Sequence, residues 1–395
     1  MEQYNPISAV IMLSLALAVC VPLARCCGVR NVHARTNAID GLRGFCATGM
    51  FVHHTCIWND YLQTRIWQLP ASRLYANLGL SAVALFFMIT SFLFFGKLLD
   101  GRKKPIDWRR HFVSRLTRLS PMYFLAMTLV VLFAFWVSGP VLRIPPPQFA
   151  HQMLNLLAFN VAESGDVNGV GETAIAIGVS WTLRYEWIYY LAMPLMALCM
   201  GVAVTRRSLI PATALALAVL LVAPLVPAIL ACFILGAIVQ LLSRVPIFTR
   251  LACRPLGSFI ALLFLVMAAR SDIAPFPLYL YLFGAFAFIA AGTNLFGALT
   301  AGPALILGEM SYSLYLLHPI ALFFVLKLVI GLDAAARLSQ LQYWSMMYCV
   351  TPLVILLCYG TFRLIEYPAM RSTDRLTKRW RAYAQRAEGR LAKQT

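Results

Sequence analysis

Long apolar stretches separated by short polar segments run along almost the whole chain. A helix crosses a membrane with about 20 mostly apolar residues, and about eleven stretches approach that length. They cover residues 6–24, 41–58, 76–97, 119–138, 181–204, 208–225, 226–242, 256–269, 275–291, 308–330 and 344–362. Strand-type alternation is absent, and in hydrocarbon only helices and closed barrels satisfy their backbone. The pattern therefore predicts an all-α, polytopic membrane bundle of about eleven transmembrane helices.

The ends of the chain differ from this central pattern. Residues 1–36 are interpreted as one N-terminal transmembrane helix with a basic linker, residues 37–370 as the membrane domain and residues 371–395 as a basic cytoplasmic tail. The first apolar run follows MEQYNP, which contains Glu2 and no Lys or Arg, and its basic cluster comes after it. A secretory signal has the opposite order, so we expect a retained helix.

Composition and charge agree with a membrane protein. Hydrophobic residues make up 61% of the chain, charged residues 12%, and the formal net charge is +18. Basic residues gather in alternate connections, above all in residues 97–118 and from residue 363 onward. The positive-inside rule then places the N-terminus outside and the C-terminus in the cytoplasm of a multi-pass protein of the cell (inner) membrane. The clusters are interpreted as topology signals and contacts with membrane lipids, not as nucleic-acid sites.

Cysteine spacing gives no sign of metal or redox chemistry. The ten cysteines contain no CxxC pair and lie mostly within apolar runs. Such residues pack as small apolar side chains more often than they bind metals or form disulfides. We therefore predict no metal site.

Ionisable residues within apolar stretches are the first candidates for function, because a charge in hydrocarbon costs several kcal/mol. Arg43 and His54 lie eleven residues apart in AIDGLRGFCATGMFVHHT, about 20° from eclipsed on one helical face and about 16 Å apart along the axis. Asp40 shares that face, whereas His53 points about 80° to its side. The alternative is structural: Asp40 and Arg43 pair at a helix start, and His54 is a hydrogen-bonded core residue.

A second cluster, HFVSRLTRLSPMYF, stands at the predicted cytoplasmic entry to a span. Arg115 and Arg118 are neighbours at i,i+3 and can hold a phosphate-bearing ligand as paired guanidinium groups. The alternative is that both side chains extend to lipid headgroups.

Two further segments combine polar and aromatic residues. SWTLRYEWIYY places Arg184 and Glu186 among aromatic rings; interfacial anchoring explains most of the rings, but an acid and a base among them favour a ligand site. In GEMSYSLYLLHP, Ser311, Tyr315 and His318 follow i, i+4, i+7 and share a face directed into the bundle. Glu309 is expected at the start of that helix, where the helix dipole alone would favour an acid.

Five motifs together resemble the acyltransferase 3 family. DGLRG with the Arg43–His54 spacing, RLTRLSPMY, SWTLRYEWIYY, SYSLYLLHP and the terminal RLIEYP occur in that family's order over residues 40–368. The resemblance implies a bundle of about ten helices that moves acyl groups, often acetyl, from cytoplasmic acyl-CoA to a hydroxyl of a saccharide or lipid-linked glycan. Two departures are an extra N-terminal helix and the lack of a segment resembling the SGNH-type esterase domain of some relatives.

The residues and the resemblance together give a hypothesis for each site residue. Catalysis is assigned to His54, Arg43 and Glu186; coenzyme binding to Arg115, Arg118 and Asp40; and acceptor binding to Trp181, Arg184, Tyr185, Glu309, Ser311, Tyr312, Tyr315 and His318. His54 would act as general base or transient acyl carrier. Acyl-CoA is the donor substrate, and the acceptor is a cell-surface polysaccharide or lipid-linked glycan.

A transporter or flippase of lipid-linked saccharides is the alternative. Its buried charges would line a pathway, and it predicts repeats with short broken helices in corresponding halves of the chain. The sequence shows neither clearly.

Overall fold

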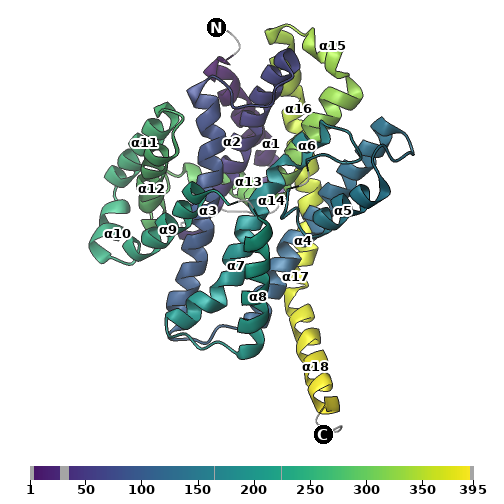
Figure 1. The fold of residues 1–395 in the computed structure, drawn as a ribbon. Helices are drawn as coiled ribbons and strands as arrows, with labels where there is room; N and C mark the ends of the chain where they lie inside the picture. The colour runs from purple at the N-terminus through teal and green to yellow at the C-terminus, as the bar shows by residue number, and fades with distance from the viewer. Residues whose placement is uncertain (1–3, 27–34, 164, 224, 392–395) are drawn as a thin grey trace.

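The chain forms a bundle of helices joined by short connections (Figure 1). The computed structural model describes residues 4–26, 35–163, 165–223 and 225–391. Over these residues it contains helices and turns but no β-strand, which confirms the all-α prediction. The predicted basic linker at residues 27–34 lies outside the described residues.

The helices follow the apolar stretches that the sequence predicts. The first part contains α1 (Pro6–Cys26), α2 (Arg35–Thr64), α3 (Arg73–Gly101), α4 (Trp108–Ser138), α5 (Pro146–Leu157), α6 (Thr173–Ile177) and the 3-10 helix η2 (Gly178–Trp181). The middle contains α7 (Thr182–Cys199), α8 (Arg206–Val222), α9 (Pro227–Leu242), α10 (Pro246–Ala252), α11 (Pro255–Arg270), α12 (Pro275–Ala291) and the 3-10 helix η3 (Ala298–Thr300). The last part contains α13 (Gly302–Glu309), α14 (Ser311–Phe323), the π-helix η4 (Phe324–Val329), α15 (Leu332–Ala336), α16 (Gln340–Thr361), the π-helix η5 (Phe362–Glu366), α17 (Tyr367–Arg371) and α18 (Thr373–Leu391).

Fewer helices have the length and composition of a membrane span than the eleven apolar stretches predict. By length and composition, 5 helices among the described residues are able to cross a membrane, or 6 if α9 and α10, bent by 97°, form one span. The helices α8, α11 and α12 have 17, 16 and 17 residues, short of the usual length of about 20, and α2 carries too many polar side chains. The chain is an integral membrane protein, but the prediction of eleven spans is not confirmed.

Close backbone contact joins α2 to α13 at the centre of the bundle. A Cβ atom at Gly44 would lie 2.6 Å from the backbone nitrogen of Gly308, and one at Gly308 would collide with the carbonyl of Asp40. Since real Cβ atoms do not tolerate such approaches, these glycines allow the two helix backbones to pack directly. The glycines of DGLRG therefore place the first polar motif against the segment that leads into SYSLYLLHP.

One helix boundary differs from the prediction. Glu309 ends α13 instead of beginning the next helix, and α14 starts at Ser311 after Met310. The dipole explanation for Glu309 is therefore wrong, because a carboxylate at a helix C-terminus is not stabilised by the helix dipole.

The two ends of the bundle, marked in Figure 1 by α18 and by α15, carry different side chains. At one end, near α18, lie Lys97, Arg110, Arg115, Arg118 and Arg371, and we call it the basic end. At the other, α15 lies beside the segment of residues 65–72 that follows α2, joined to it by an ion pair between Arg65 and Asp333. We call this the opposite end.

Candidate active site

Two histidines from distant parts of the sequence meet between α2 and α14. Nδ1 of His54 lies 2.8 Å from Nε2 of His318, although 264 residues separate them in the chain. Their rings are stacked with centroids 5.0 Å apart. The sequence predicted that His318 faces the interior of the bundle and that His54 shares a helical face with Arg43; the structure shows that the two histidines contact each other.

The hydrogen bonds of this pair define where its protons lie. Nδ1 of His318 is 2.8 Å from the carbonyl oxygen of Leu314, which can only accept. Nδ1 of a neutral His318 therefore carries the proton, and its Nε2 accepts from Nδ1–H of His54. Nε2 of His54 is left with its lone pair, and it has no hydrogen-bond partner within the described part of the chain. Nε2 of His54 is therefore a basic nitrogen, and the hydrogen bond from Nδ1 to His318 fixes the orientation of its ring.

His53, next in sequence to His54, has a different environment. Its Nδ1 lies 2.7 Å from the carbonyl oxygen of Tyr75, and its ring packs against Gly79 of α3. It is buried, and its ring lies beside that of His54 with centroids 5.1 Å apart. The angular offset between His53 and His54 on α2 thus separates a residue that packs from one that faces the candidate site.

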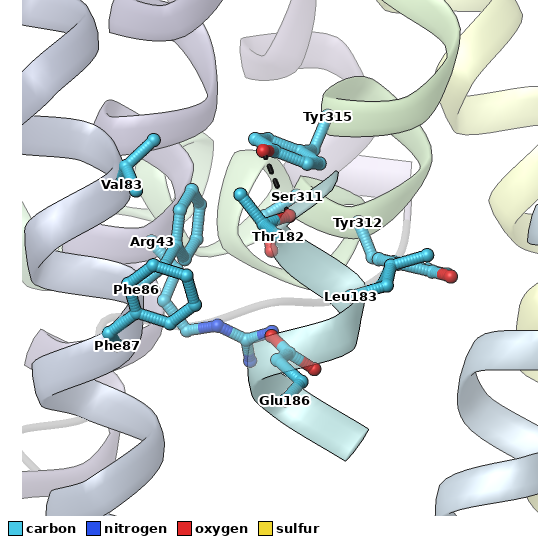
Figure 2. A pocket seen from close by; sticks show the side chains of 10 residues that line it. All are labelled: Arg43, Val83, Phe86, Phe87, Thr182, Leu183, Glu186, Ser311, Tyr312 and Tyr315. Carbon is cyan, nitrogen blue, oxygen red and sulfur yellow. Dashed lines mark hydrogen bonds between the residues drawn. The ribbon is translucent and has the colours of Figure 1, made fainter. Parts of the chain in front are cut away.

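A cavity of about 50 Å³ lies between α2, α3, α7 and α14 (Figure 2). Its lining consists of Arg43, Val83, Phe86, Phe87, Thr182, Leu183, Glu186, Ser311, Tyr312 and Tyr315. The Oγ atom of Ser311 is buried and has no hydrogen-bond partner in the described residues. Tyr315 also contacts His318, with ring centroids 6.3 Å apart, so the cavity adjoins the histidine pair.

Charged side chains enter this cavity from two helices. Arg43 on α2 and Glu186 on α7 extend to the same side of it (Figure 2). The charges of Glu186, Glu366 and Arg118 act on the guanidinium of Arg43. A looser contact ties Arg43 to Asp40, at 3.7 Å, as the sequence predicted for one helical face. Burial among apolar side chains strengthens these interactions because water does not screen them.

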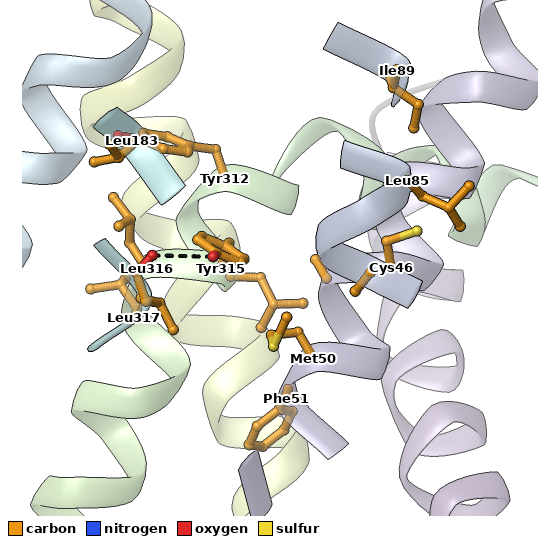
Figure 3. Close-up of a cluster of buried hydrophobic side chains, with 14 of the residues drawn as sticks. Cys46, Met50, Phe51, Leu85, Ile89, Leu183, Tyr312, Tyr315, Leu316 and Leu317 are labelled. Atoms are coloured by element: carbon orange, nitrogen blue, oxygen red, sulfur yellow. Dashed lines mark hydrogen bonds between the residues drawn. The ribbon is translucent and has the colours of Figure 1, made fainter. Parts of the chain in front are cut away.

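Apolar side chains surround the polar ones. Figure 3 shows Cys46, Met50 and Phe51 of α2 near Leu316 and Leu317 of α14, with Tyr315 among them. Phe51 also contacts His318, with ring centroids 5.9 Å apart. This packing surrounds the imidazoles with apolar side chains.

Larger cavities open at the basic end. One of about 340 Å³ is lined by Arg110, Ser114, Arg115, Arg118, Met370, Arg371, Thr373 and Asp374. A second, of about 570 Å³, shares three of these residues and adds Lys97 and Lys104. The structure therefore brings Arg115 and Arg118 to one cavity, of a size typical for ligands.

Arg115 connects this cavity to the inner one. Its guanidinium lies 4.9 Å from the ring centre of Phe94 and 5.6 Å from that of Tyr190. The hydroxyl of Tyr190 donates a 2.9 Å hydrogen bond to Glu186. Because Arg115 is held by aromatic rings inside the protein, extension to lipid headgroups does not describe its position.

The other residues that the sequence assigned to acceptor binding do not all lie at the inner cavity. Arg184 forms a 2.7 Å ion pair with Glu163 and lies over the rings of Trp181 and Tyr185, and none of these residues lines the inner cavity. The hydroxyl of Tyr312 donates to the carbonyl of Leu119. Glu309 is exposed. The structure therefore brings Arg43, Glu186, Ser311, Tyr312, Tyr315 and the two histidines together, and leaves the Arg184 cluster and Glu309 outside that group.

Sequence reasoning missed two residues of the site region. Glu366 is fully buried and accepts a 2.8 Å hydrogen bond from Ser313. Ser313 follows Tyr312, which lines the inner cavity. In the sequence Glu366 stands three residues after Arg363 in RLIEYP, the spacing of an i,i+3 ion pair, but the guanidinium of Arg363 lies over the ring of Tyr367. Trp67 stacks on His54 from a segment with no periodicity; its aromatic character beside the long helix α2 was the only signal. Among the described residues, no group of three or more His, Cys, Asp and Glu side chains could hold a metal ion.

Comparison with known proteins gives one match. The sequence model of a family described as an acyltransferase domain, acyltransferase 3, matches residues 36–363. Searches of curated proteins and of solved structures found no match. The matched region covers α2 to α16 except Arg35, the first residue of α2. It contains both histidines, Arg43 and Glu186 of the inner cavity, and Arg115 and Arg118 of the basic end. The chain therefore belongs to the acyltransferase 3 family and is a membrane acyltransferase.

Proposed function

We propose that this protein moves an acyl group, in the first instance acetyl, from cytoplasmic acyl-CoA to a hydroxyl of a cell-surface polysaccharide or lipid-linked glycan. The observation that carries the proposal is the hydrogen bond between His54 and His318, which leaves Nε2 of His54 as an oriented base. The protein lies in the inner membrane of the cell with its N-terminus outside and its C-terminus in the cytoplasm, in agreement with the distribution of basic residues.

The donor binds at the basic end. The phosphates of coenzyme A contact Arg115 and Arg118, which line the cavity of about 340 Å³ and have no carboxylate partner among the described residues. Paired guanidinium groups hold phosphate oxygens through charge-assisted hydrogen bonds. The thioester then extends past Tyr190 and Glu186 toward the inner cavity beside Arg43.

Transfer takes place between that cavity and His54. The acceptor hydroxyl gives its proton to Nε2 of His54, and its oxygen attacks the thioester carbonyl carbon. When the tetrahedral intermediate collapses, the carbon–sulfur bond breaks, and the coenzyme A thiolate takes the proton from His54. An ester and free coenzyme A result, and the enzyme returns to its starting protonation state.

His318 supports this step without touching the acceptor. In the intermediate His54 is an imidazolium, and its Nδ1–H donates to the neutral Nε2 of His318. The carbonyl of Leu314 holds the opposite nitrogen of His318 in its protonated form. This fixed orientation lowers the cost of bringing the base to the reacting hydroxyl.

The negative charge on the thioester oxygen also needs a partner. Ser311 presents to the inner cavity a buried hydroxyl that has no hydrogen-bond partner in the described residues, and Arg43 lines the same cavity with a positive charge. A donor and a charge held in a dry site stabilise a developing oxyanion more than water does. We therefore assign this role to Ser311 and Arg43, and assign Glu186 to holding Arg43.

Acyl transfer by purified protein tests the proposal. Protein in lipid nanodiscs is incubated with acetyl-CoA labelled in the acetyl group and with oligosaccharides released by mild acid from the surface polysaccharide of the cells that make it. We expect label to enter the oligosaccharide as an alkali-labile ester, with one coenzyme A released per ester. Free coenzyme A without labelled sugar, or no coenzyme A release at all with acetyl, succinyl and longer acyl donors, would contradict it.

A further inference from the structure

An aromatic cluster covers His54 on the side that faces the opposite end. His54, Trp58 and Tyr61 follow i, i+4, i+7 on α2 and so share one face of the helix. Trp67 packs along that face: its ring is stacked on His54 with centroids 5.9 Å apart and planes 21° apart. It meets Trp58 and Tyr61 edge-on, at 5.7 and 6.0 Å.

A chain reversal at the end of α2 puts Trp67 in this place. Arg65 has a positive φ of 58°, which ends the helix and turns the chain back. The backbone N–H of Ile66 then donates to Oγ1 of Thr64 at 3.2 Å. Residues 65–72 return along α2 without regular secondary structure, and Trp67 remains 37% exposed. The indole of Trp67 is therefore partly exposed and covers His54, and the segment that carries it, residues 65–72, belongs to no helix.

Paired charges stand around the cluster. Arg65 binds Asp333 at 2.7 Å, and Lys327 binds Glu172 at 2.9 Å. Arg65 and Glu172 both act electrostatically on Tyr61, so they lie near its hydroxyl. The indole N–H of Trp58, which is fully buried, donates no hydrogen bond within the described residues. Aromatic faces with a few polar groups and no excess charge suit a neutral, hydroxyl-rich ring, since the ring's C–H face packs on indole and its hydroxyls meet the polar groups.

We propose that Trp67, with Tyr61 and Trp58, forms the acceptor site and selects a saccharide ring. This assignment rests on the proposed function, because it names the substrate class of the same site. The sugar enters from the opposite end, the segment of residues 65–72 moves outward, and the indole face that now covers His54 stacks on the sugar. One of its hydroxyls then faces Nε2 of His54. Without a sugar, Trp67 keeps water away from the base and limits hydrolysis of the donor.

Chemical labelling of His54 tests the cover without any need for activity. Diethyl pyrocarbonate modifies neutral imidazole nitrogen, and mass spectrometry of the peptide that contains His54 gives its rate of modification in purified protein. We expect Trp67→Ala to raise that rate about tenfold relative to wild type, which corresponds to 1.4 kcal/mol of lost protection. Trp67→Phe should stay close to wild type, as should Trp136→Ala, a matched control whose indole is 73% exposed on α4. An unchanged rate in Trp67→Ala would overturn the assignment.

Two arms with ligands test saccharide selection. The surface-polysaccharide oligosaccharides should slow the labelling of His54 in wild type but not in Trp67→Ala, whereas glycerol should protect neither. In the transfer assay, Trp67→Ala should raise the KM for these oligosaccharides about tenfold, leave the KM for acetyl-CoA unchanged, and increase coenzyme A release into water. Equal protection and equal KM in both proteins would refute the acceptor site even if acyl transfer occurs. If wild type transfers no acyl group, the proposed function fails, and the labelling arms still decide whether Trp67 covers His54 and binds the sugar.

Discussion

The two ends of the bundle differ in how far their basic side chains are paired with carboxylates. At the basic end, Arg115 and Arg118 line one cavity and form no ion pair with a carboxylate within the described chain, although Arg110 pairs with Asp374 and Arg244 with Asp100, each at 2.8 Å, and Arg381 pairs with Asp107. At the opposite end, Arg65 and Arg73 each bind an aspartate at 2.7 Å, and Lys327 binds Glu172. One end thus keeps positive charge in excess, and the other balances it beside aromatic rings.

This difference matches the two substrates of the proposed reaction. An excess of guanidinium groups attracts an anionic ligand such as a coenzyme. A balanced, aromatic surface gives little attraction to anions but packs well on a neutral ring. The histidine pair and the inner cavity lie between these ends, so the chemistry belongs where the two kinds of recognition meet. Each experiment below removes one part of this arrangement.

The largest effect is expected at His54. His54→Ala should lower acyl transfer at least about 100-fold, about 3 kcal/mol of barrier, because the proposed general base is lost. His53→Ala should retain much of the activity, since that ring binds the carbonyl of Tyr75 and packs against Gly79. The measurement is acetyl incorporation into oligosaccharide at matched amounts of monodisperse protein. Equal losses in both variants would remove the distinction between the two histidines.

A smaller loss is expected at His318, whose proposed role is to position His54. His318→Ala should lower kcat about 10- to 100-fold, because a hydrogen bond to a charged imidazolium is worth about 1.5–3 kcal/mol. His318→Gln keeps a carbonyl oxygen able to accept from Nδ1–H of His54, so it should recover part of the rate. A structural role alone would lower protein yield and leave kcat of the folded fraction and its pH profile as in wild type.

Helical periodicity accounts for the part of this site that the sequence could predict. It placed His54 and His53 on different faces of α2 and gathered Ser311, Tyr315 and His318 on one face of α14, and each of the eleven apolar stretches overlaps at least one helix. Periodicity fixes directions within one helix but does not determine which helices pack together. The contact between His54 and His318 therefore required the structure.

Breaks in periodicity account for much of what the sequence did not predict. Met310 separates α13 from α14 and puts Glu309 at a helix end, and the π-helix η5 turns Glu366 toward Ser313. Trp67 follows a reversal at a non-glycine residue with positive φ, which leaves no recognisable turn signal. Each case depends on backbone geometry that hydrophobic spacing does not encode.

The excess charge of the basic end can be removed directly. Changing Arg115 and Arg118 together to Gln should raise the KM for acetyl-CoA about tenfold, about 1.4 kcal/mol, because paired contacts to phosphate are lost. The KM for the oligosaccharide should not change. The control is Arg102→Gln with Lys103→Gln, two exposed residues on the same side that line neither of the two basic-end cavities beside Arg115. If the control variant raises the KM equally, general surface charge and not the cavity attracts the donor.

The smallest effect is expected at the balanced end, where Glu172 and Lys327 are both mostly buried. Burial works against the charge on Glu172, but the hydrogen bond from Lys327 and the charges of Lys327 and Arg65 outweigh it, so the pKa of the carboxyl is lowered from its ordinary value. A lowered pKa means that the pair stabilises the fold above the unfolded glutamate pKa of about 4.3, and that this stabilisation is lost as pH falls through the folded pKa. Glu172→Gln should therefore be less stable than wild type at neutral pH by at most about 1 kcal/mol. Thermal unfolding followed by circular dichroism between pH 3 and 7 should show the gap closing below about pH 4. A gap that stays constant across this range would mean that Glu172 contributes through packing and not through its charge.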